Sequence, residues 1–248
     1  MASFTNFSDT LPNPNNPIAY DGSSNSNNAG YAEGPGYRQV SVRSQFRTAR
    51  DKTNTGVLVT RNKAYQNFTV DVTYNPLTEA EFNSIYGFLM EKQGQLKTFF
   101  VPLPQHDDPQ DSTLASHSPE PVFTVKSPGY SAGKTKITIE DTTNYNSSTD
   151  GQLRPGDLIT FTDSSDSNHL KAYQITRVET SADYTGTQPG TDELRISFVP
   201  PLQKDLSSGA TVNYKVPKMK VTLNSDEINY SLATNNLYNF SMKLEEVR

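Results

Sequence analysis

The stretch YQNFTVDVTYNPLTEAEFNSIYGFLMEKQGQLKTFFVPLP, residues 65–104, decides the fold, because a strand, a helix and a second strand follow one another in it. From Phe68 to Tyr74 every second residue is apolar, which predicts a strand with one buried face. Asn75-Pro76 ends that strand, since proline restricts the conformation of the residue before it.

The helix of this stretch is predicted over residues 78–93. Thr78 and Glu81 have the spacing of a capping box, and Gly94 supplies a left-handed position after the last turn. One apolar stripe has helical spacing and consists of Phe82, Ile85, Tyr86 and Leu89. We therefore expect this helix to pack on a sheet and to contribute nothing to catalysis, and we expect residues 96–101 to return as a strand.

The composition bounds the protein classes to consider. The chain has 248 residues, no cysteine, a net charge of −5 and a pI near 5.2. Disulfides and thiolate metal sites are excluded, and the acidic balance disfavours specific binding to nucleic acid. No apolar run is long enough to span a bilayer, and residues 1–30 lack the pattern of a secretory signal. Turn-forming residues with frequent Tyr and Phe favour a mainly β protein, and the absence of cysteine is compatible with assembly in a reducing cytoplasm.

Residues 1–36 have almost no apolar periodicity, as in the segments NPNNP and DGSSNSNNAG. Two interpretations remain open: a disordered tail, or an N-terminal extended arm that becomes ordered on a neighbouring subunit. The expected anchors of such an arm are its isolated apolar residues, namely Phe4, Phe7, Leu11, Ile18 and Tyr20.

The rest of the chain divides into a β domain and an insertion. Residues 37–47 predict a strand, 48–56 a polar turn or long loop, and 57–61 a short strand. Alternation returns at residues 219–223 and 238–244, which can complete the sheet that carries the helix. We therefore assign residues 37–104 and 217–248 to one domain.

Residues 105–121 have the content of a linker, rich in proline and acidic residues. After them, turn signals separate six short strand candidates, at 122–126, 136–140, 157–162, 172–178, 194–199 and 211–216. This spacing predicts an inserted small β-barrel over residues 122–216. The expected fold class is thus mainly β with one flanking helix.

No motif for catalysis survives comparison with an ordinary structural role. Residues 129–135, GYSAGKT, have one residue too few for a phosphate-binding loop and precede a strand. The metal-capable side chains at 105–121 lack calcium-loop spacing; they are His106, Asp107, Asp108, Asp111 and His117. Other polar candidates fall in predicted loops without a catalytic pattern: Asp141, Asp150, Asp163, Asp166 and His169. We predict no catalytic, cofactor or metal site, and no enzyme.

Loop aromatics and glycosylation triplets are the remaining candidates. The tyrosines in or beside predicted loops could stack on sugars or anchor an interface, although half-buried strand ends are their ordinary role; they are Tyr20, Tyr31, Tyr37, Tyr65, Tyr130, Tyr145 and Tyr184. The Asn-x-Ser/Thr triplets at Asn6, Asn67 and Asn146 would matter only in a secreted protein.

Several segments together resemble the minor tail and distal tail proteins of long-tailed bacteriophages. They are GPGYRQV (34–40), NFTVDVTY (67–74), LTEAEFNSIYGFLMEKQG (77–94) and LKTFFVPLP (96–104). The family's usual Gly-Asp-Gly-Tyr has Pro35 in place of Asp here, and Phe68 stands where a Trp is often found. Residues 151–161 and 171–178, GQLRPGDLITF and KAYQITRV, are similar to small barrels inserted into phage tail proteins.

The resemblance implies a tail-tube-like β-sandwich or split barrel whose subunits form a homo-oligomeric ring, expected to be a hexamer. Such a ring joins the tail tube to the tip or baseplate of the virion, so its partners would be itself and other tail proteins. The inserted barrel could contact a host glycan, and neither specific nucleic acid nor membrane insertion is expected. The alternative is a carbohydrate-binding β module for host-surface adhesion, and a tail-associated hydrolase is the least favoured interpretation.

Overall fold

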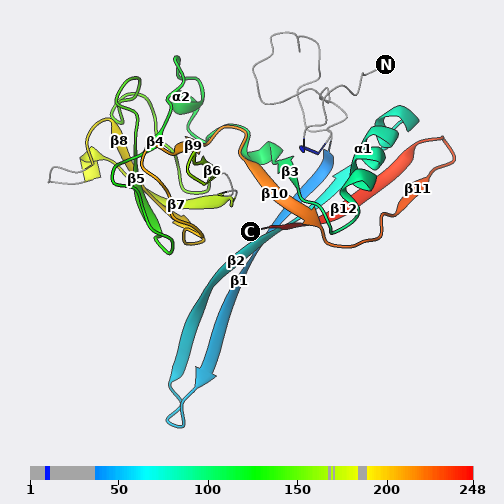
Figure 1. The fold of residues 1–248 in the computed structure, drawn as a ribbon, viewed down its shortest axis with the longest axis horizontal. Helices are drawn as coiled ribbons and strands as arrows, with labels where there is room; N and C mark the ends of the chain where they lie inside the picture. The colour runs from blue at the N-terminus through cyan, green and yellow to red at the C-terminus, as the bar shows by residue number, and fades with distance from the viewer. Residues whose placement is uncertain (1–8, 12–36, 167–168, 170, 184–188, 248) are drawn as a thin grey trace. The chain divides into compact units, whose positions relative to one another are not determined.

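The computed structural model describes residues 9–11, 37–166, 169, 171–183 and 189–247, without the side chains of residues 47 and 62–65 (Figure 1). The predicted mainly β fold with a small barrel is confirmed. The chain divides into two compact units. One comprises Met1–Ser44, Asn67–Pro104 and Lys218–Val247, and the other includes Gln45–Gln66 and Gln105–Pro217.

The first unit is a sheet carrying a helix, although residues 45–66, the outer parts of its strands β1 and β2, are grouped with the second unit. Its strands lie in the order β1-β2-β12-β10-β3, with β11 paired to β12. The bounds of these elements are β1 Tyr37–Lys52, β2 Leu58–Tyr74, α1 Glu79–Lys92, β3 Phe99–Pro102, β10 Lys218–Leu223, β11 Tyr230–Leu232 and β12 Tyr238–Glu246. Strands β10 and β12, from the C-terminal segment, therefore lie between β2 and β3, all antiparallel to their neighbours.

Helix α1 begins and ends where the sequence predicts. The Glu81 carboxylate accepts from the Thr78 amide at 2.8 Å, and Gln93 and Gly94 both have positive φ after the last turn. Phe82 stacks on Tyr238 of β12 at 4.5 Å between ring centroids. The helix therefore packs on the sheet through the predicted stripe, although its Tyr86 is only half-buried.

A short piece of the N-terminal segment lies on β3. The Leu11 amide donates to the Phe100 carbonyl at 2.8 Å, and the Phe100 amide donates to the Asp9 carbonyl at 2.7 Å. The Asp9 carboxylate also pairs with the buried Lys92 ammonium of α1 at 2.7 Å. Leu11, one of the expected anchors of the arm, is thus buried on its own chain, because the free edge of β3 offers unpaired main-chain groups. The other four expected anchors of the arm lie outside the described residues.

The hairpin of β1 and β2 is much longer than the sequence suggests. We expected a polar loop at 48–56 and a separate short strand at 57–61, but β1 runs to Lys52 and β2 runs unbroken from Leu58 to Tyr74. The expected return strand at 96–101 is shorter, because residues 93–97 form turns and β3 starts at Phe99. Strand β11, whose three side chains are all exposed, was not predicted, although Ile228, Tyr230 and Leu232 alternate with polar residues.

The second unit contains the barrel. Its strands close in the order β4-β5-β8-β7-β6-β9 and match the six predicted segments: β4 Thr124–Val125, β5 Lys136–Glu140, β6 Leu158–Thr162, β7 Tyr173–Glu179, β8 Glu193–Val199 and β9 Thr211–Asn213. Its core is aromatic and aliphatic, with the Tyr173 and Phe198 rings 5.1 Å apart. The short helices are η2 Pro104–His106, α2 Ser112–Ala115 and η3 Ser181–Asp183.

The segment 105–121 is not a simple linker. It contains α2, whose Leu114 is fully buried in the barrel core. The Asp111 carboxylate caps this helix by accepting from the Thr113 amide at 2.9 Å. The proline and acidic content therefore reflects a folded, capped turn attached to the barrel. No helix in the described part of the chain is long and apolar enough to cross a membrane.

Candidate functional site: the β1–β2 ribbon

The outer part of the β1–β2 hairpin, residues 45–61, is a two-stranded ribbon that we call the β1–β2 ribbon (Figure 1). A compact turn closes it: the Thr53 amide donates to the Val57 carbonyl at 2.9 Å, and the Gly56 amide donates to the Thr53 carbonyl at 2.8 Å. Gly56 has φ +83, a conformation that glycine adopts without strain. The turn fixes the two strands but buries no side chain of either.

Apolar side chains of the ribbon face solvent. The large exposed ones are Phe46 (62%), Val57 (60%), Leu58 (48%) and Val59 (52%). A two-stranded hairpin is marginal alone in water, and exposed apolar side chains mark a surface suited to contact a partner; three of the four, Val57, Leu58 and Val59, lie beside the turn. The ribbon is therefore the described feature best suited to be an interface.

The ribbon is also basic in an acidic chain. It carries Arg47, Arg50, Lys52 and Arg61 against the single acid Asp51, a net charge of +3. Because the whole chain carries −5, the other residues carry −8. The charge is thus segregated between the basic ribbon and the acidic rest of the chain.

The two edge strands of the sheet, β1 and β3, differ in whether another segment covers them. Strand β1 is the last strand at one side, with only β2 as its sheet neighbour among the described residues. At the other side, residues 9–11 cover part of the edge of β3. A strand edge is a site for association with another strand or chain, and residues 45–52 of β1 have no sheet neighbour besides β2 among the described residues, so they add main-chain groups to the exposed side chains of the ribbon.

The predicted metal-capable set serves structural roles. Burial lowers the pKa of His106, and burial beside Asp108 raises the pKa of Asp107 to about 6. For Asp111, burial favours the neutral acid, but hydrogen bonds from Arg154 and backbone amides outweigh it and lower the pKa. In the described residues, no three His, Asp or Glu side chains come together as a possible metal site.

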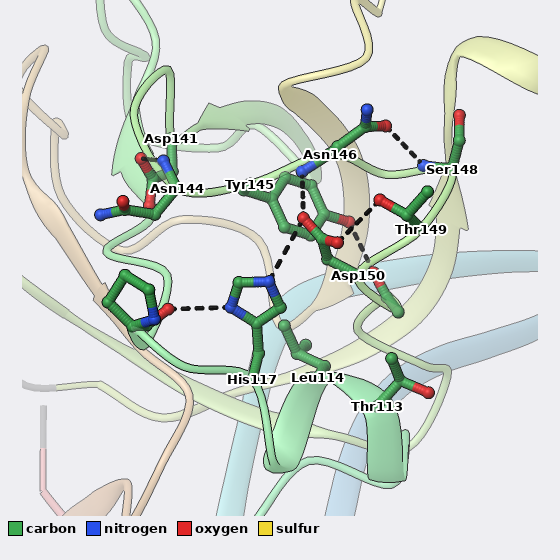
Figure 2. Close-up of polar contacts among 12 residues, drawn as sticks. Thr113, Leu114, His117, Asp141, Asn144, Tyr145, Asn146, Ser148, Thr149 and Asp150 are labelled. Carbon is green, nitrogen blue, oxygen red and sulfur yellow. Dashed lines mark hydrogen bonds and ion pairs between the residues drawn. The ribbon is translucent and has the colours of Figure 1, made fainter.

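His117 and Asp150 form a polar cluster on the barrel (Figure 2). His117 Nδ1 lies 2.8 Å from the Pro119 carbonyl, which can only accept, so Nδ1 carries a proton. Its Nε2 faces the Asp150 carboxylate at 3.4 Å. Hydrogen bonding from Thr149 and from the Asn146 amide lowers the pKa of Asp150. The cluster joins the segment after α2 to the 145–151 loop and needs no ligand to explain it.

The remaining carboxylates brace loops. Asp141 accepts from the backbone amides of Val122, Thr143 and Asn144 at 2.8, 2.9 and 3.1 Å. Burial works against ionisation of Asp163, but amide hydrogen bonds, including one from Ser207 at 2.7 Å, lower its pKa.

Two further candidate residues, Asp166 and His169, also make contacts within the protein. The Asp166 carboxylate pairs with Lys204 at 3.1 Å. Burial lowers the pKa of His169, which contacts the Tyr173 hydroxyl at 3.0 Å.

The glycine-rich segment 129–135 is a turn. The Tyr130 amide donates to the Leu206 carbonyl at 2.8 Å, and the Gly133 amide donates to the Leu202 carbonyl at 2.7 Å. A phosphate-binding loop needs such amides free to face the ligand, and here the protein's own carbonyls occupy them. The segment is followed by β5, as the sequence predicts.

None of the predicted loop tyrosines whose side chains the structure describes is exposed. Tyr37 and Tyr145 are buried, and the hydroxyl of the half-buried Tyr130 accepts from the Thr138 amide at 2.9 Å. Tyr20, Tyr31 and Tyr184 and the side chain of Tyr65 lie outside the described residues. Of the glycosylation triplets, Asn67 is buried, Asn146 belongs to the loop at His117, and Asn6 is outside the described residues.

The ribbon itself was missed by the sequence interpretation. The signal that could have found it is local charge, because basic residues recur through residues 43–63 while acidic ones are nearly absent. Comparison with known proteins adds no identification: no family model and no curated protein sequence matches the chain.

Proposed function

We propose that the chain is a structural subunit of a bacteriophage tail, a ring-forming distal tail or tail-tip adaptor that joins the tail tube to the tip or baseplate. The observation that carries the proposal is the β1–β2 ribbon, with its exposed Phe46, Val57, Leu58 and Val59. Such a surface is costly in an isolated subunit and is covered when subunits associate.

The open sheet supports the same proposal. Closed rings of identical subunits cover sheet edges that would otherwise promote uncontrolled association, and the long edge of β1 is such an edge. The barrel, in contrast, has no open strand edge along its closed order and is suited to be an attachment on the ring subunit. The resemblance of residues 34–40 and 67–104 to tail proteins supplies the tail as the setting.

The test is the oligomeric state of the full chain. Mass photometry and negative-stain electron microscopy should show a closed ring, with six subunits expected from the resemblance. A chain that stays monomeric at tens of micromolar would contradict the proposal. A neighbouring gene that resembles a tape-measure protein would link the ring to a tail.

A further inference from the structure

Exposed large apolar side chains gather in two places on the described part of the chain. Four of the nine are on the β1–β2 ribbon, and one, Val122, precedes the barrel. The other four are Met90 (53%), Leu96 (72%), Tyr230 (50%) and Leu232 (54%), on and after α1 and on β11. Two separate apolar surfaces on one chain are the components of a contact between copies that does not pair a surface with itself.

The second surface is continuous in the fold of the first unit. The Tyr230 ring lies 5.6 Å from that of Tyr86, which is one helical turn before Met90. At the end of α1 the Gln95 amide donates to the Asp226 carboxylate at 3.0 Å, so the loop before β11 is fixed to the helix terminus. Figure 1 shows α1 beside β11.

We call this surface the α1–β11 face, and define it by its apolar and acidic members: Met90, Glu91, Leu96, Asp226, Glu227, Tyr230 and Leu232. Its acids are Glu91, Asp226 and Glu227, all exposed, with Lys97 as an exposed base nearby. The loop 224–229 also borders a cavity of about 380 Å³ lined by Ile228 and Met242 among others. The face is thus apolar and acidic, where the ribbon is apolar and basic.

We propose that the β1–β2 ribbon of one copy docks on the α1–β11 face of a second copy. The inference rests on the proposed ring and names its interface. The two surfaces are complementary in apolar character and in charge. Each has four exposed apolar side chains, and the ribbon has a net charge of +3 whereas the face is acidic. Since the two surfaces differ, each subunit uses its ribbon on one neighbour and its face on the other. Such head-to-tail contacts generate a ring when the rotation from one subunit to the next closes, as the proposed ring requires.

The exposed apolar residues favour a protein partner over nucleic acid. Basic ribbons can bind phosphates, but the affinity of a protein for a DNA backbone comes mainly from its cationic side chains, and exposed apolar side chains add little to it. Phe46, Val57 and Val59 gain from contact with apolar side chains instead, and the α1–β11 face supplies them at the same place as the acids. Binding of DNA by the ribbon is therefore the outcome that competes with the proposal.

The test is a charge swap in the full chain. One variant carries Arg50→Glu and Lys52→Glu on the ribbon, and the other carries Glu91→Lys and Glu227→Lys on the face. Each should raise the apparent Kd of assembly about a hundredfold, because like charges then face each other. An equimolar mixture should recover the ring, since every contact of an alternating ring is matched. The matched control is Lys134→Glu with Asp108→Lys on the second unit, which should assemble as the wild type does.

Mass photometry on these samples separates the outcomes. Loss of the ring in each variant and its return in the mixture supports the interface, and the return also shows that both variants are folded. Rings that persist in both variants, or a mixture that stays monomeric, overturn the interface and leave the proposed ring standing. A monomeric wild type overturns the proposed function itself. If the ribbon variant still assembles but loses affinity for short duplex DNA by fluorescence anisotropy, the ribbon binds nucleic acid and the inference is wrong.

Discussion

The barrel and the β1–β2 ribbon are both antiparallel β structure, yet they solve the problem of strand edges in opposite ways. In the barrel each of the six strands has a neighbour on both sides, because the order closes on itself. In the ribbon each strand has only the other. Closure satisfies main-chain groups within one chain, whereas an open ribbon leaves them to water or to a partner.

Side chains repeat the contrast. Barrel residues such as Phe123, Ile139 and Tyr173 are fully buried, while Phe46 and Val57 of the ribbon are more than half exposed. Apolar burial is the main favourable contribution to folding, so the barrel is stabilised within its own chain. The ribbon would gain that stabilisation from the neighbouring subunit of the proposed ring.

Two Phe→Ala substitutions, one in the barrel and one in the ribbon, test this contrast, and the barrel substitution should have the largest effect on stability. Phe123→Ala should lower the stability of the barrel by about 3–5 kcal/mol, because it empties a site where the ring contacts Tyr145 and Tyr214. Phe46→Ala should change monomer stability by less than about 0.5 kcal/mol. Since the chain has two units, hydrogen exchange read by mass spectrometry on peptides of each unit is the appropriate measurement.

The same two variants should have the opposite order of effects on ring assembly. Phe46→Ala should weaken the ring while leaving barrel exchange unchanged, and Phe123→Ala should do the reverse wherever the barrel remains folded. If Phe46→Ala destabilised the monomer as much as Phe123→Ala does, the ribbon would be part of a folded core and the contrast would fail.

The same contrast explains what the sequence could predict. Each barrel strand buries at least one face, so apolar alternation and turn residues identified all six strands. The ribbon buries neither face, so TARDK at 48–52 carries no alternation and resembles a loop although β1 includes it. A strand whose side chains are exposed in its own chain shows no alternating burial in its sequence. Its exposed apolar residues and its charge are the signals that remain.

Segment 105–121 was misjudged for a different reason. Its one essential apolar residue, Leu114, lies among acidic and proline residues, so composition predicted a linker. The folded segment depends instead on Asp111. Its carboxylate caps α2 and also accepts hydrogen bonds from Gln152 and Arg154, in the loop before β6. A network between residues about 40 positions apart in sequence leaves no local pattern.

Asp111→Ala should have the next largest effect, lowering barrel stability by roughly 2–3 kcal/mol. The carboxylate caps α2 and accepts from Arg154 Nη2 at 2.9 Å, so its removal leaves the amide of Thr113 and the guanidinium without that acceptor. Asp111→Asn keeps the cap and should recover part of the loss. Equal effects of Ala and Asn would mean that the charge on Arg154, not the cap, dominates.

Lowering the pH below 4 should destabilise the barrel through three of its carboxylates. Asp111, Asp150 and Asp163 have folded-state pKa values below the usual 3.8, so the unfolded chain binds their protons more readily. Their contribution is therefore complete above pH 4 and is lost as the pH falls through the lowered values. Urea midpoints followed by barrel exchange should decrease below pH 4, and a midpoint that rises there would contradict the sign.

The smallest expected effect is in the first unit, where Thr78→Ala should cost about 1 kcal/mol and leave the barrel unchanged. The Thr78 hydroxyl and amide both donate to Glu81 at 2.8 Å, so the substitution removes one side of the capping pair. Fraying of the first turn loosens Phe82 against Tyr238; Phe82 also contacts Tyr230 of the α1–β11 face, with 4.8 Å between ring centroids, but Met90 of that face lies two helical turns further along α1. Exchange should increase at the start of α1 with assembly almost unchanged. A large loss of the ring from this variant would show that the N-terminal turn of α1, which we leave out of the α1–β11 face, belongs to the interface.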